Sequence, residues 1–192
     1  MDDSLEAGEL RALVDRAQQH SADAWEQLYR TYRPRLVSYA GRRLPNVHAA
    51  EDAVSEAFSR AIASVEGFSW QGVGFVGWMY GITRNVVLET QRAATRDRNL
   101  ANRATGAART DGRLVMDDVG SDLESEHDRS VLRRVFDGLD DADREILELR
   151  IVGELSAEEV GVILDKKPGA VRMAQSRALD RLRVAMKEAH NA

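Results

Sequence analysis

The C-terminal stretch from residue 139 to residue 183 restricts the fold more than any other part of the chain. It reads as two short helices, a tight turn and a last basic helix. Ser156 and Glu159 have the spacing of a capping box, in which each side chain accepts a hydrogen bond from the backbone amide of the other. Leu155 and Val160 occupy the staple positions on either side of the cap. These signals predict a short helix that begins just after Ser156.

The next helix is predicted to begin at Pro168. Because proline disfavours a helical residue before it and suits a first helical turn, the preceding helix should end near Asp165. The new helix carries one apolar side, made of Val171, Ala174, Ala178 and Leu182. Two short helices joined by a few residues, the second one basic, are typical of a helix-turn-helix whose second helix enters the major groove of DNA.

A basic amphipathic helix is also compatible with a plain solvated face that binds nothing. The order of the parts favours the DNA-binding interpretation. A stapled support helix, a tight turn and the Lys166-Lys167 pair at the start of the basic helix occur together.

Composition favours an all-α protein of one medium domain or two small ones. The 192 residues include only 6% aromatic residues and three prolines. There is no cysteine, which excludes disulfides and thiolate-bound zinc. No apolar run approaches membrane-spanning length and the acidic N-terminus lacks a signal-peptide pattern, so we expect a cytoplasmic protein without membrane insertion.

The charges are segregated along the chain. The formal net charge is −5, yet the stretches 84–103 and 166–187 are rich in arginine and lysine, while 117–145 is mostly acidic. Such a chain is expected to bind DNA weakly alone and better when a partner orients its basic patches.

A break in helical periodicity divides the chain into two modules. From about residue 101 to residue 122, small, polar and acidic residues dominate, which is typical of a linker. We therefore predict an N-terminal module at 4–99, a flexible linker at 100–123 and a C-terminal module at 124–189.

The N-terminal module is predicted to be helical throughout. One helix covers about 10–17, a second follows a Ser21 cap, and residues 44–46 break the chain before a third. The third helix is expected to bury Val54, Ala57, Phe58, Ala61 and Ile62, and to present Glu51, Asp52, Ser55, Glu56 and Ser59 outward. A loop rich in glycine and tryptophan, 67–74, precedes a fourth helix over 75–92, with Phe75, Trp78, Met79, Ile82 and Val86 at helical spacing.

Three motifs carry a resemblance to a known family. Residues 75–85, FVGWMYGITRN, resemble the F-x-x-W-[LM]-x-x-I-x-R-N signature of region 2 in bacterial sigma factors, and residues 50–58 resemble the A-E-D-x-V-Q-E-x-F pattern before it. Residues 139–182 resemble region 4, including its G-x-V-[KR] pattern at 169–172. Since the length leaves no room for a middle domain, the chain is similar to the small extracytoplasmic-function sigma factors.

The resemblance implies a role for each surface. The outward face of the third helix, namely Glu51, Asp52, Ser55 and Glu56, would dock on core RNA polymerase, whose clamp helices and flap are the expected contacts. The loop residues Ser69, Trp70 and Gln71 would capture a base flipped from the −10 element, with Arg84, Asn85, Arg92 and Arg96 on the following helix contacting phosphates or bases. The residues Lys166, Lys167, Arg172, Met173 and Ser176 would read the −35 element of promoter DNA, arginine being suited to guanine.

Plainer interpretations stay open beside these roles. The acidic face of the third helix could be only solvated, and Trp70 could pack on its own domain. The family pattern has glutamine at Ser55, a helix-ending glycine at Asp165, a serine or threonine cap at Lys167 and an apolar residue at Gln175. The last three departures could alter the tilt of the recognition helix.

No enzyme chemistry is indicated, and no cofactor or metal site. The four histidines are isolated and no glycine-rich phosphate loop follows a strand. The alternatives to a sigma factor are a stand-alone transcription regulator with a sigma-like helix-turn-helix and a helical adaptor protein. An anti-sigma factor is a further expected partner, since members of this family are commonly held inactive by one.

Overall fold

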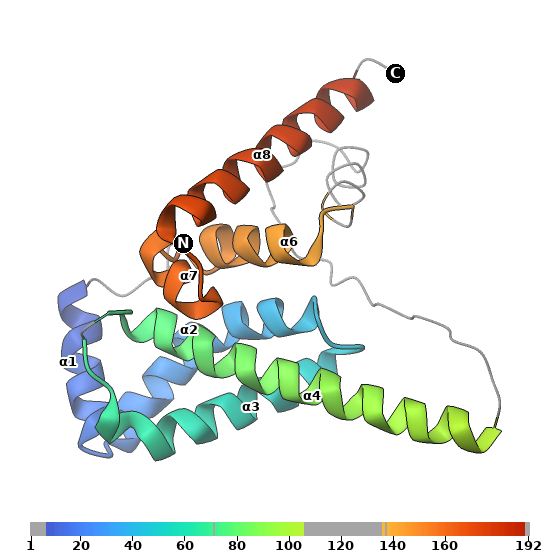
Figure 1. Ribbon diagram of the computed structural model, residues 1–192. Coiled ribbons are helices and arrows are strands. Elements are labelled where there is room, and N and C mark those ends of the chain that lie inside the picture. The colour runs from blue at the N-terminus through green and yellow to red at the C-terminus, as the bar shows by residue number, and fades with distance from the viewer. Residues whose placement is uncertain (1–6, 71, 106–135, 137, 191–192) are drawn as a thin grey trace. The chain divides into compact units, whose positions relative to one another are not determined.

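The computed structural model describes residues 7–70, 72–105, 136 and 138–190, with side chains for these except 99–105 and 189–190. Within these residues every regular element is a helix, so the all-α prediction is confirmed (Figure 1). The chain divides into two compact units, the first holding α1, α2, α3 and most of α4, and the second holding α6, α7 and α8. Residues 100–105 of the predicted flexible linker belong to helix α4, and its remaining residues, 106–123, lie outside the described residues.

The first unit begins with α1 (Ala7–Gln18) and α2 (Ala22–Gly41). The predicted cap is present, because the Ser21 side chain accepts a hydrogen bond from the Ala24 amide. Helix α3 (Val47–Ser64) starts after the predicted break, where Asn46 caps it by accepting from the Ala49 amide at 2.8 Å. A 3-10 turn, η1 (Val65–Gly67), ends α3, and α4 (Phe75–Thr105) completes the unit.

Aromatic and aliphatic side chains fill the interior of this unit. Leu28, Leu36, Val54 and Val87 are completely buried. The rings of Tyr39 on α2 and Tyr80 on α4 meet edge to face, with centroids 5.4 Å apart. Such aromatic pairs add about 0.5–1.5 kcal/mol beyond the area they bury. Helix α4, which carries the expected DNA-contacting residues, is thereby fixed to α2.

Two details of the predicted helices were wrong. Ile62 is 44% exposed, because the buried stripe of α3 runs through Ala61 to Val65 and leaves residue 62 outside it. Helix α4 ends at Thr105 rather than at Arg92. Neither glycine nor proline interrupts the sequence after residue 92 before Gly106, so nothing local stops the helix.

The second unit consists of α6 (Asp141–Leu147), a π-helical turn η2 (Glu148–Val152), α7 (Ala157–Leu164) and α8 (Pro168–His190). Asp140 caps α6, and the hydrogen bond from the Asp143 amide is the main reason that the pKa of the Asp140 carboxyl lies below its usual value. Leu139, Leu147 and Ala178 form a buried cluster that joins α6 to α8.

The predicted capping box at the start of α7 is confirmed. The Glu159 amide donates to Ser156 Oγ at 3.1 Å, and the Ser156 amide donates to Glu159 Oε2 at 2.8 Å. The two staple residues, Leu155 and Val160, are 2% and 0% exposed. Helix α7 therefore begins where the sequence predicts.

The turn between α7 and α8 depends on two backbone features. Asp165 follows α7 in the left-handed conformation, with φ 53° and ψ 49°. A Cβ atom at Gly161 would lie 2.6 Å from the Lys166 carbonyl oxygen, so only glycine permits this close approach. The Lys166 amide donates to the Gly161 carbonyl at 2.8 Å, which closes the turn.

Replacing Asp165 by valine is expected to destabilise the second unit by about 1–2 kcal/mol, since β-branched side chains strongly disfavour a positive φ. Replacing Asp165 by glycine should have no cost or stabilise the unit, because glycine adopts this conformation freely. Thermal unfolding followed by circular dichroism measures both changes. Equal stability of the two variants would show that the turn conformation is not fixed.

Candidate nucleic-acid and polymerase interfaces

Helix α8 has one buried side and one exposed side. Val171, Ala174 and Ala178 are at most 4% exposed, as the predicted apolar stripe requires. The side chains expected to read the −35 element are all exposed; they are Lys166, Lys167, Arg172, Met173 and Ser176. Met173 is 65% exposed although it is apolar. This surface combines cationic, apolar and hydroxyl groups, the types that contact base edges in a major groove.

The departures from the family pattern at Lys167 and Gln175 are accommodated differently, at Lys167 by backbone hydrogen bonds alone and at Gln175 by a side-chain hydrogen bond. The Lys167 carbonyl accepts from the amides of Ala170 and Val171 and so begins α8 through the backbone. The Gln175 Oε1 atom accepts from Arg150 Nε at 2.8 Å, and Arg150 Nη1 donates to the Leu155 carbonyl. Gln175 thus ties α8 to the end of η2 with a polar contact instead of an apolar one.

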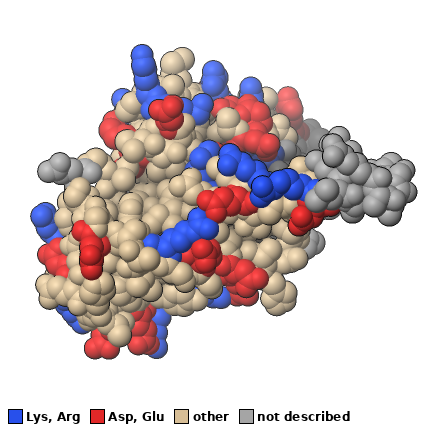
Figure 2. All heavy atoms as spheres, turned by 60° about the horizontal axis from the view of Figure 1, so that its bottom comes forward, with Lys and Arg blue, Asp and Glu red and all other residues tan. Residues whose placement is uncertain are grey.

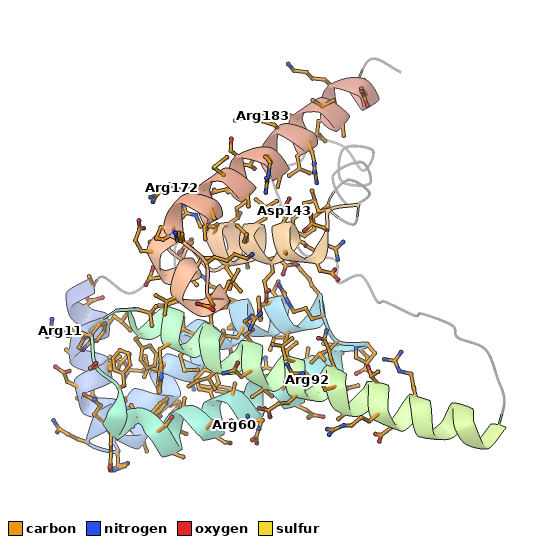
Figure 3. All side chains as sticks on the ribbon, viewed as in Figure 1. Arg11, Arg60, Arg92, Asp143, Arg172 and Arg183 are labelled. Atoms are coloured by element: carbon orange, nitrogen blue, oxygen red, sulfur yellow. The ribbon has the colours of Figure 1, made fainter. Side chains whose placement is uncertain are left out.

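Arg172 makes an ion pair with the support helix (Figure 3). Its Nη1 atom donates to Glu158 Oε1 on α7 at 2.8 Å. This hydrogen bond is the main reason that the pKa of the Glu158 carboxyl is lowered. Both side chains stay largely exposed, so the guanidinium is held in place at the surface.

Two buried charged residues of α6 have different partners: Asp143 joins α6 to α8 (Figure 3), and Arg144 joins α6 to the residues before it. Asp143 is buried on α6, and its carboxylate lies 3.8 Å from the guanidinium groups of Arg177 and of Arg181 on α8. Arg144, also buried, donates to the Leu139 carbonyl at 2.9 Å and to the Phe136 carbonyl at 3.2 Å. The Asp143 ion pairs hold α8 against α6, and the Arg144 hydrogen bonds fasten the residues that precede α6.

The predicted base-capture loop is fastened at its base. The Gln18 side chain, at the end of α1, donates to the carbonyls of Val65 and Phe68 at 3.1 and 3.0 Å. The Trp70 ring packs edge to face on Phe68 with centroids 5.3 Å apart, and the Arg11 guanidinium lies 5.6 Å from the Trp70 ring. Trp70 therefore does pack on its own domain.

The loop has two more residues with an expected role in base capture. Ser69 is exposed, and Gln71 lies outside the described residues. Phe68, on which Trp70 packs, also contacts Trp78 of α4, with 5.1 Å between the ring centroids. The described loop residues therefore lie beside the N-terminal part of α4.

The expected DNA-contacting residues of α4 lie along one helix. Arg92 (Figure 3), Asn85 and Arg96 are exposed, and Arg84 is partly buried. A row of cationic side chains with an amide among them can neutralise phosphates and donate hydrogen bonds to bases. The geometry is compatible with the predicted role.

The acidic face of α3 is less uniform than the sequence predicts. Asp52, Ser55 and Glu56 are exposed, but the Glu51 carboxylate turns toward α2, where Arg33 Nη2 lies 2.5 Å from its Oε1. Glu51 is thus already paired within the chain.

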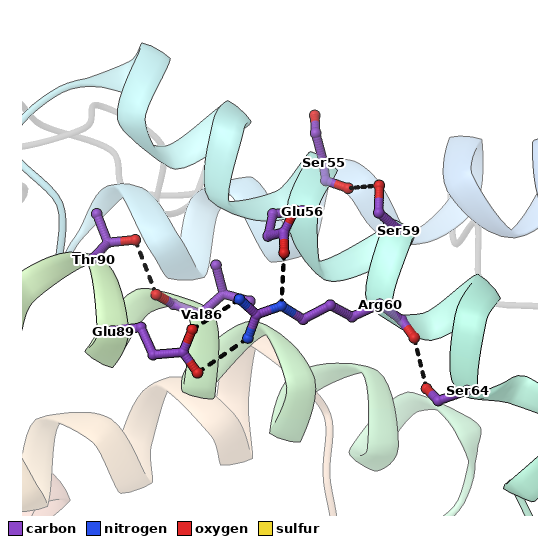
Figure 4. Close-up of polar contacts among 8 residues, drawn as sticks. All are labelled: Ser55, Glu56, Ser59, Arg60, Ser64, Val86, Glu89 and Thr90. Carbon is purple, nitrogen blue, oxygen red and sulfur yellow. Dashed lines mark hydrogen bonds and ion pairs between the residues drawn. The ribbon is translucent and has the colours of Figure 1, made fainter.

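Arg60 links α3 to α4 through two carboxylates (Figure 4). Its Nε donates to Glu56 Oε1 at 2.8 Å, and its Nη1 donates to Glu89 Oε1 on α4 at 3.0 Å. The hydrogen bond from Arg60 is the main reason that the pKa of the Glu89 carboxyl is lowered. The expected polymerase-docking face and the DNA-contacting helix are therefore connected by one guanidinium.

Charges of both signs lie next to one another on the face drawn in Figure 2. No group of three or more potential metal ligands occurs among the residues that the structure describes. In the same residues no helix combines the length and apolar character needed to cross a membrane.

Comparison with known families and structures identifies the class of protein to which this fold belongs. The Sigma-70 region 2 family model matches residues 28–97, and the Sigma-70 region 4 model matches residues 126–184. The structure is similar to CnrH in complex with the cytosolic domain of CnrY (TM-score 0.61, 22% identity, covering 93% of this chain and 97% of that chain). It is also similar to the sigma factor RpoE in complex with the anti-sigma factor NepR from Bartonella quintana (TM-score 0.63, 20% identity, 84% and 96% covered). These likenesses concern the fold.

Curated relatives narrow the class further. The ECF RNA polymerase sigma factor SigD of Mycobacterium tuberculosis is 33% identical over 186 residues, covering 94% of this chain and 85% of that protein. The ECF sigma factor ShbA of Streptomyces griseus is 30% identical, with 90% and 92% covered. The chain therefore belongs to the ECF family of RNA polymerase sigma factors, which are transcription regulators.

Sequence reasoning missed three of the residues that shape these surfaces. Glu158, Arg60 and Gln18 each act through a partner at least 14 residues away in the sequence. The capping box already marked Glu158 as part of the first turn of α7, but no local pattern indicates that its side chain meets Arg172.

Proposed function

We propose that the surfaces described above divide the work of promoter recognition. Helix α8 reads the −35 element, the loop after η1 together with α4 recognises and melts the −10 element, and α3 docks on the clamp helices of core RNA polymerase, with the flap as a second contact. The modules correspond to residues 4–99 and 124–189. The observation that carries the proposal is the exposed group on α8, set on a helix whose other side is buried.

The −35 assignment is supported by the chemistry of the exposed group. Arg172 suits bidentate contact with guanine, Met173 suits apolar contact with a thymine methyl group, and Lys166 suits phosphate contact. Lys167 and Ser176 complete the surface.

The −10 assignment is supported by the position of the loop beside α4. Flipping a base out of the duplex costs a few kcal/mol, which stacking on an aromatic ring can offset. The Trp70 ring is only partly buried, so it presents some π-surface beside Ser69. Arg84, Asn85, Arg92 and Arg96 supply donors for the adjoining strand.

For polymerase docking, the exposed residues Asp52, Ser55 and Glu56 are the better candidates. Glu51 contributes less, because Arg33 already compensates its charge. Glu56 is also paired, with Arg60 on the same helix, so Asp52 is the carboxylate of this face that has no partner among the described residues, and a basic partner would gain most from it.

We also propose that an anti-sigma factor controls the chain and that it acts in the cytoplasm with RNA polymerase. The RpoE structure similar to this one holds the anti-sigma factor NepR. The chain has no cysteine, so a thiol sensor would have to belong to a partner. The proposal makes the chain a non-enzyme, since the polymerase performs the chemistry of transcription.

Run-off transcription with core polymerase on genomic DNA tests the proposal. The isolated chain is expected to bind duplex DNA poorly because its net charge is −5. The holoenzyme should bind a cognate promoter with an affinity that falls steeply with salt, as phosphate contacts release counterions. Filter binding across a salt series measures both.

The opposite pattern would favour a stand-alone regulator. Tight, sequence-specific binding by the isolated full-length chain at physiological salt, without stoichiometric binding to core polymerase, contradicts the proposed division of work.

A further inference from the structure

The Glu158 carboxylate lies beside the arginine that is proposed to read the −35 element. It comes from the first turn of α7, the support helix, and reaches Arg172 Nη1 at 2.8 Å. The two side chains are 63% and 58% exposed. The pKa of the Glu158 carboxyl is lowered, first by the Arg172 hydrogen bond and second by a backbone hydrogen bond, so the carboxylate is ionised at neutral pH.

This ion pair is not needed to hold the two helices together. Val160 on α7 and Val171 on α8 are fully buried, and Gly161 and Lys166 close the turn through their backbones. An exposed pair of this kind contributes little to folding, because water screens the charges. Its position on the surface that faces DNA suggests a different purpose.

The contact leaves one edge of the guanidinium available. Arginine has five donors in a rigid plane, and Nη1 is the atom that Glu158 occupies. Among the described residues Arg172 makes no other hydrogen bond. The Nε and Nη2 atoms lie along the opposite edge of the group, and two parallel donors on one edge match O6 and N7 of guanine.

The carboxylate also changes which groups on DNA attract the arginine. Phosphates are the commonest partners of arginine on DNA and carry no sequence information. A negative charge 2.8 Å from the guanidinium compensates its charge and repels the full negative charge of a nearby phosphate, whereas a guanine carries no net charge and is repelled much less.

We propose that Glu158 is a positioning residue for promoter discrimination, which aims the free edge of Arg172 at a guanine and disfavours its engagement with phosphate. The inference rests on the proposed −35 role of Arg172. It predicts that Glu158 lowers the affinity for DNA in general while raising the preference for one base pair.

The test compares holoenzymes carrying Arg172→Ala, Glu158→Ala or both, on promoters that differ at single −35 base pairs. Arg172→Ala is expected to reduce discrimination at one base pair by roughly 5–150-fold, the scale of a bidentate arginine contact. Glu158→Ala should reduce discrimination at the same base pair by about fivefold and strengthen binding to non-promoter DNA, with a steeper salt dependence. The double variant should discriminate no worse than Arg172→Ala alone.

Asp180→Ala is the matched control. Asp180 lies on α8 and, like Glu158, pairs with an arginine of that helix, Arg183, at 3.1 Å, so its removal changes the net charge equally. It should leave discrimination at the −35 base pairs unchanged. Thermal unfolding of each variant confirms that the fold is retained.

The outcomes separate the inference from the function on which it rests. If Arg172→Ala abolishes discrimination but Glu158→Ala leaves it intact, the positioning role of Glu158 is wrong and the −35 role of Arg172 stands. If Glu158→Ala reduces discrimination equally with and without Arg172, Glu158 acts independently and the inference also fails. If Arg172→Ala lowers transcription equally from every −35 variant, Arg172 is a phosphate contact and the proposed reading role fails.

Discussion

Replacing Arg144 by methionine is expected to destabilise the unit of α6, α7 and α8 by about 2–4 kcal/mol, because two carbonyls lose a charged donor in a buried setting. The side chain is only 7% exposed and donates to the Phe136 and Leu139 carbonyls and to the Asp141 carboxylate. Methionine fills a similar volume but donates no hydrogen bond. Hydrogen exchange of the α6 and α8 amides in the full chain measures the loss, together with a fall in transcription by the holoenzyme.

Arg183→Met is the matched control for this change. Arg183 is 74% exposed and contacts Asp180 three residues before it on the same helix. Its removal should change stability by no more than about 0.5 kcal/mol, as for most surface substitutions. Equal protection of the amides in both variants would contradict the structural role of Arg144.

Replacing Trp70 by alanine is expected to reduce open-complex formation by about tenfold or more while leaving polymerase binding intact. Stacking of one base on an aromatic side chain contributes about 1–3 kcal/mol, and alanine offers no ring. Permanganate footprinting of the −10 region reports melting, and co-elution with core polymerase reports binding. Deleting the loop over residues 69–73 should have a still larger effect.

Glu66→Gln is a control at the base of the same loop, where Glu66 is 74% exposed and pairs with His20 at 2.8 Å. It should melt the promoter normally. Normal melting by the Trp70→Ala protein as well would remove the base-capture role from Trp70, whose ring would then serve only to pack on Phe68.

Much of this fold could be predicted because its signals are local. The Ser21 cap, the capping box at Ser156 and the proline that begins α8 each depend on residues within one turn of one another. Apolar periodicity likewise identified the buried side of α8. The family resemblance then supplied the expected roles of the exposed residues, which periodicity alone could not assign.

The features that were missed depend on side chains meeting across the fold. Nothing near Ile62 in the sequence indicates that this residue lies outside the buried side of α3. The polar residue Gln175, an apparent defect on an apolar side, has a partner in Arg150, 25 residues away. The sequence predicts Glu51 as part of an outward acidic face, but in the fold Arg33 on α2 pairs with it. Pairing of this kind requires tertiary structure.

The two hydrogen bonds from Gln18 bear on how shortened versions of this protein should be made. The Sigma-70 region 2 match begins at residue 28, so a fragment cut there would keep the whole matched segment and still lose α1. It would also lose the amide group that holds the Val65 and Phe68 carbonyls, and the guanidinium of Arg11 beside Trp70. Such a fragment also lacks the capped start of α2, so a defect in strand separation by the fragment would not by itself be a property of the loop, whose fastening group lies some fifty residues upstream of it.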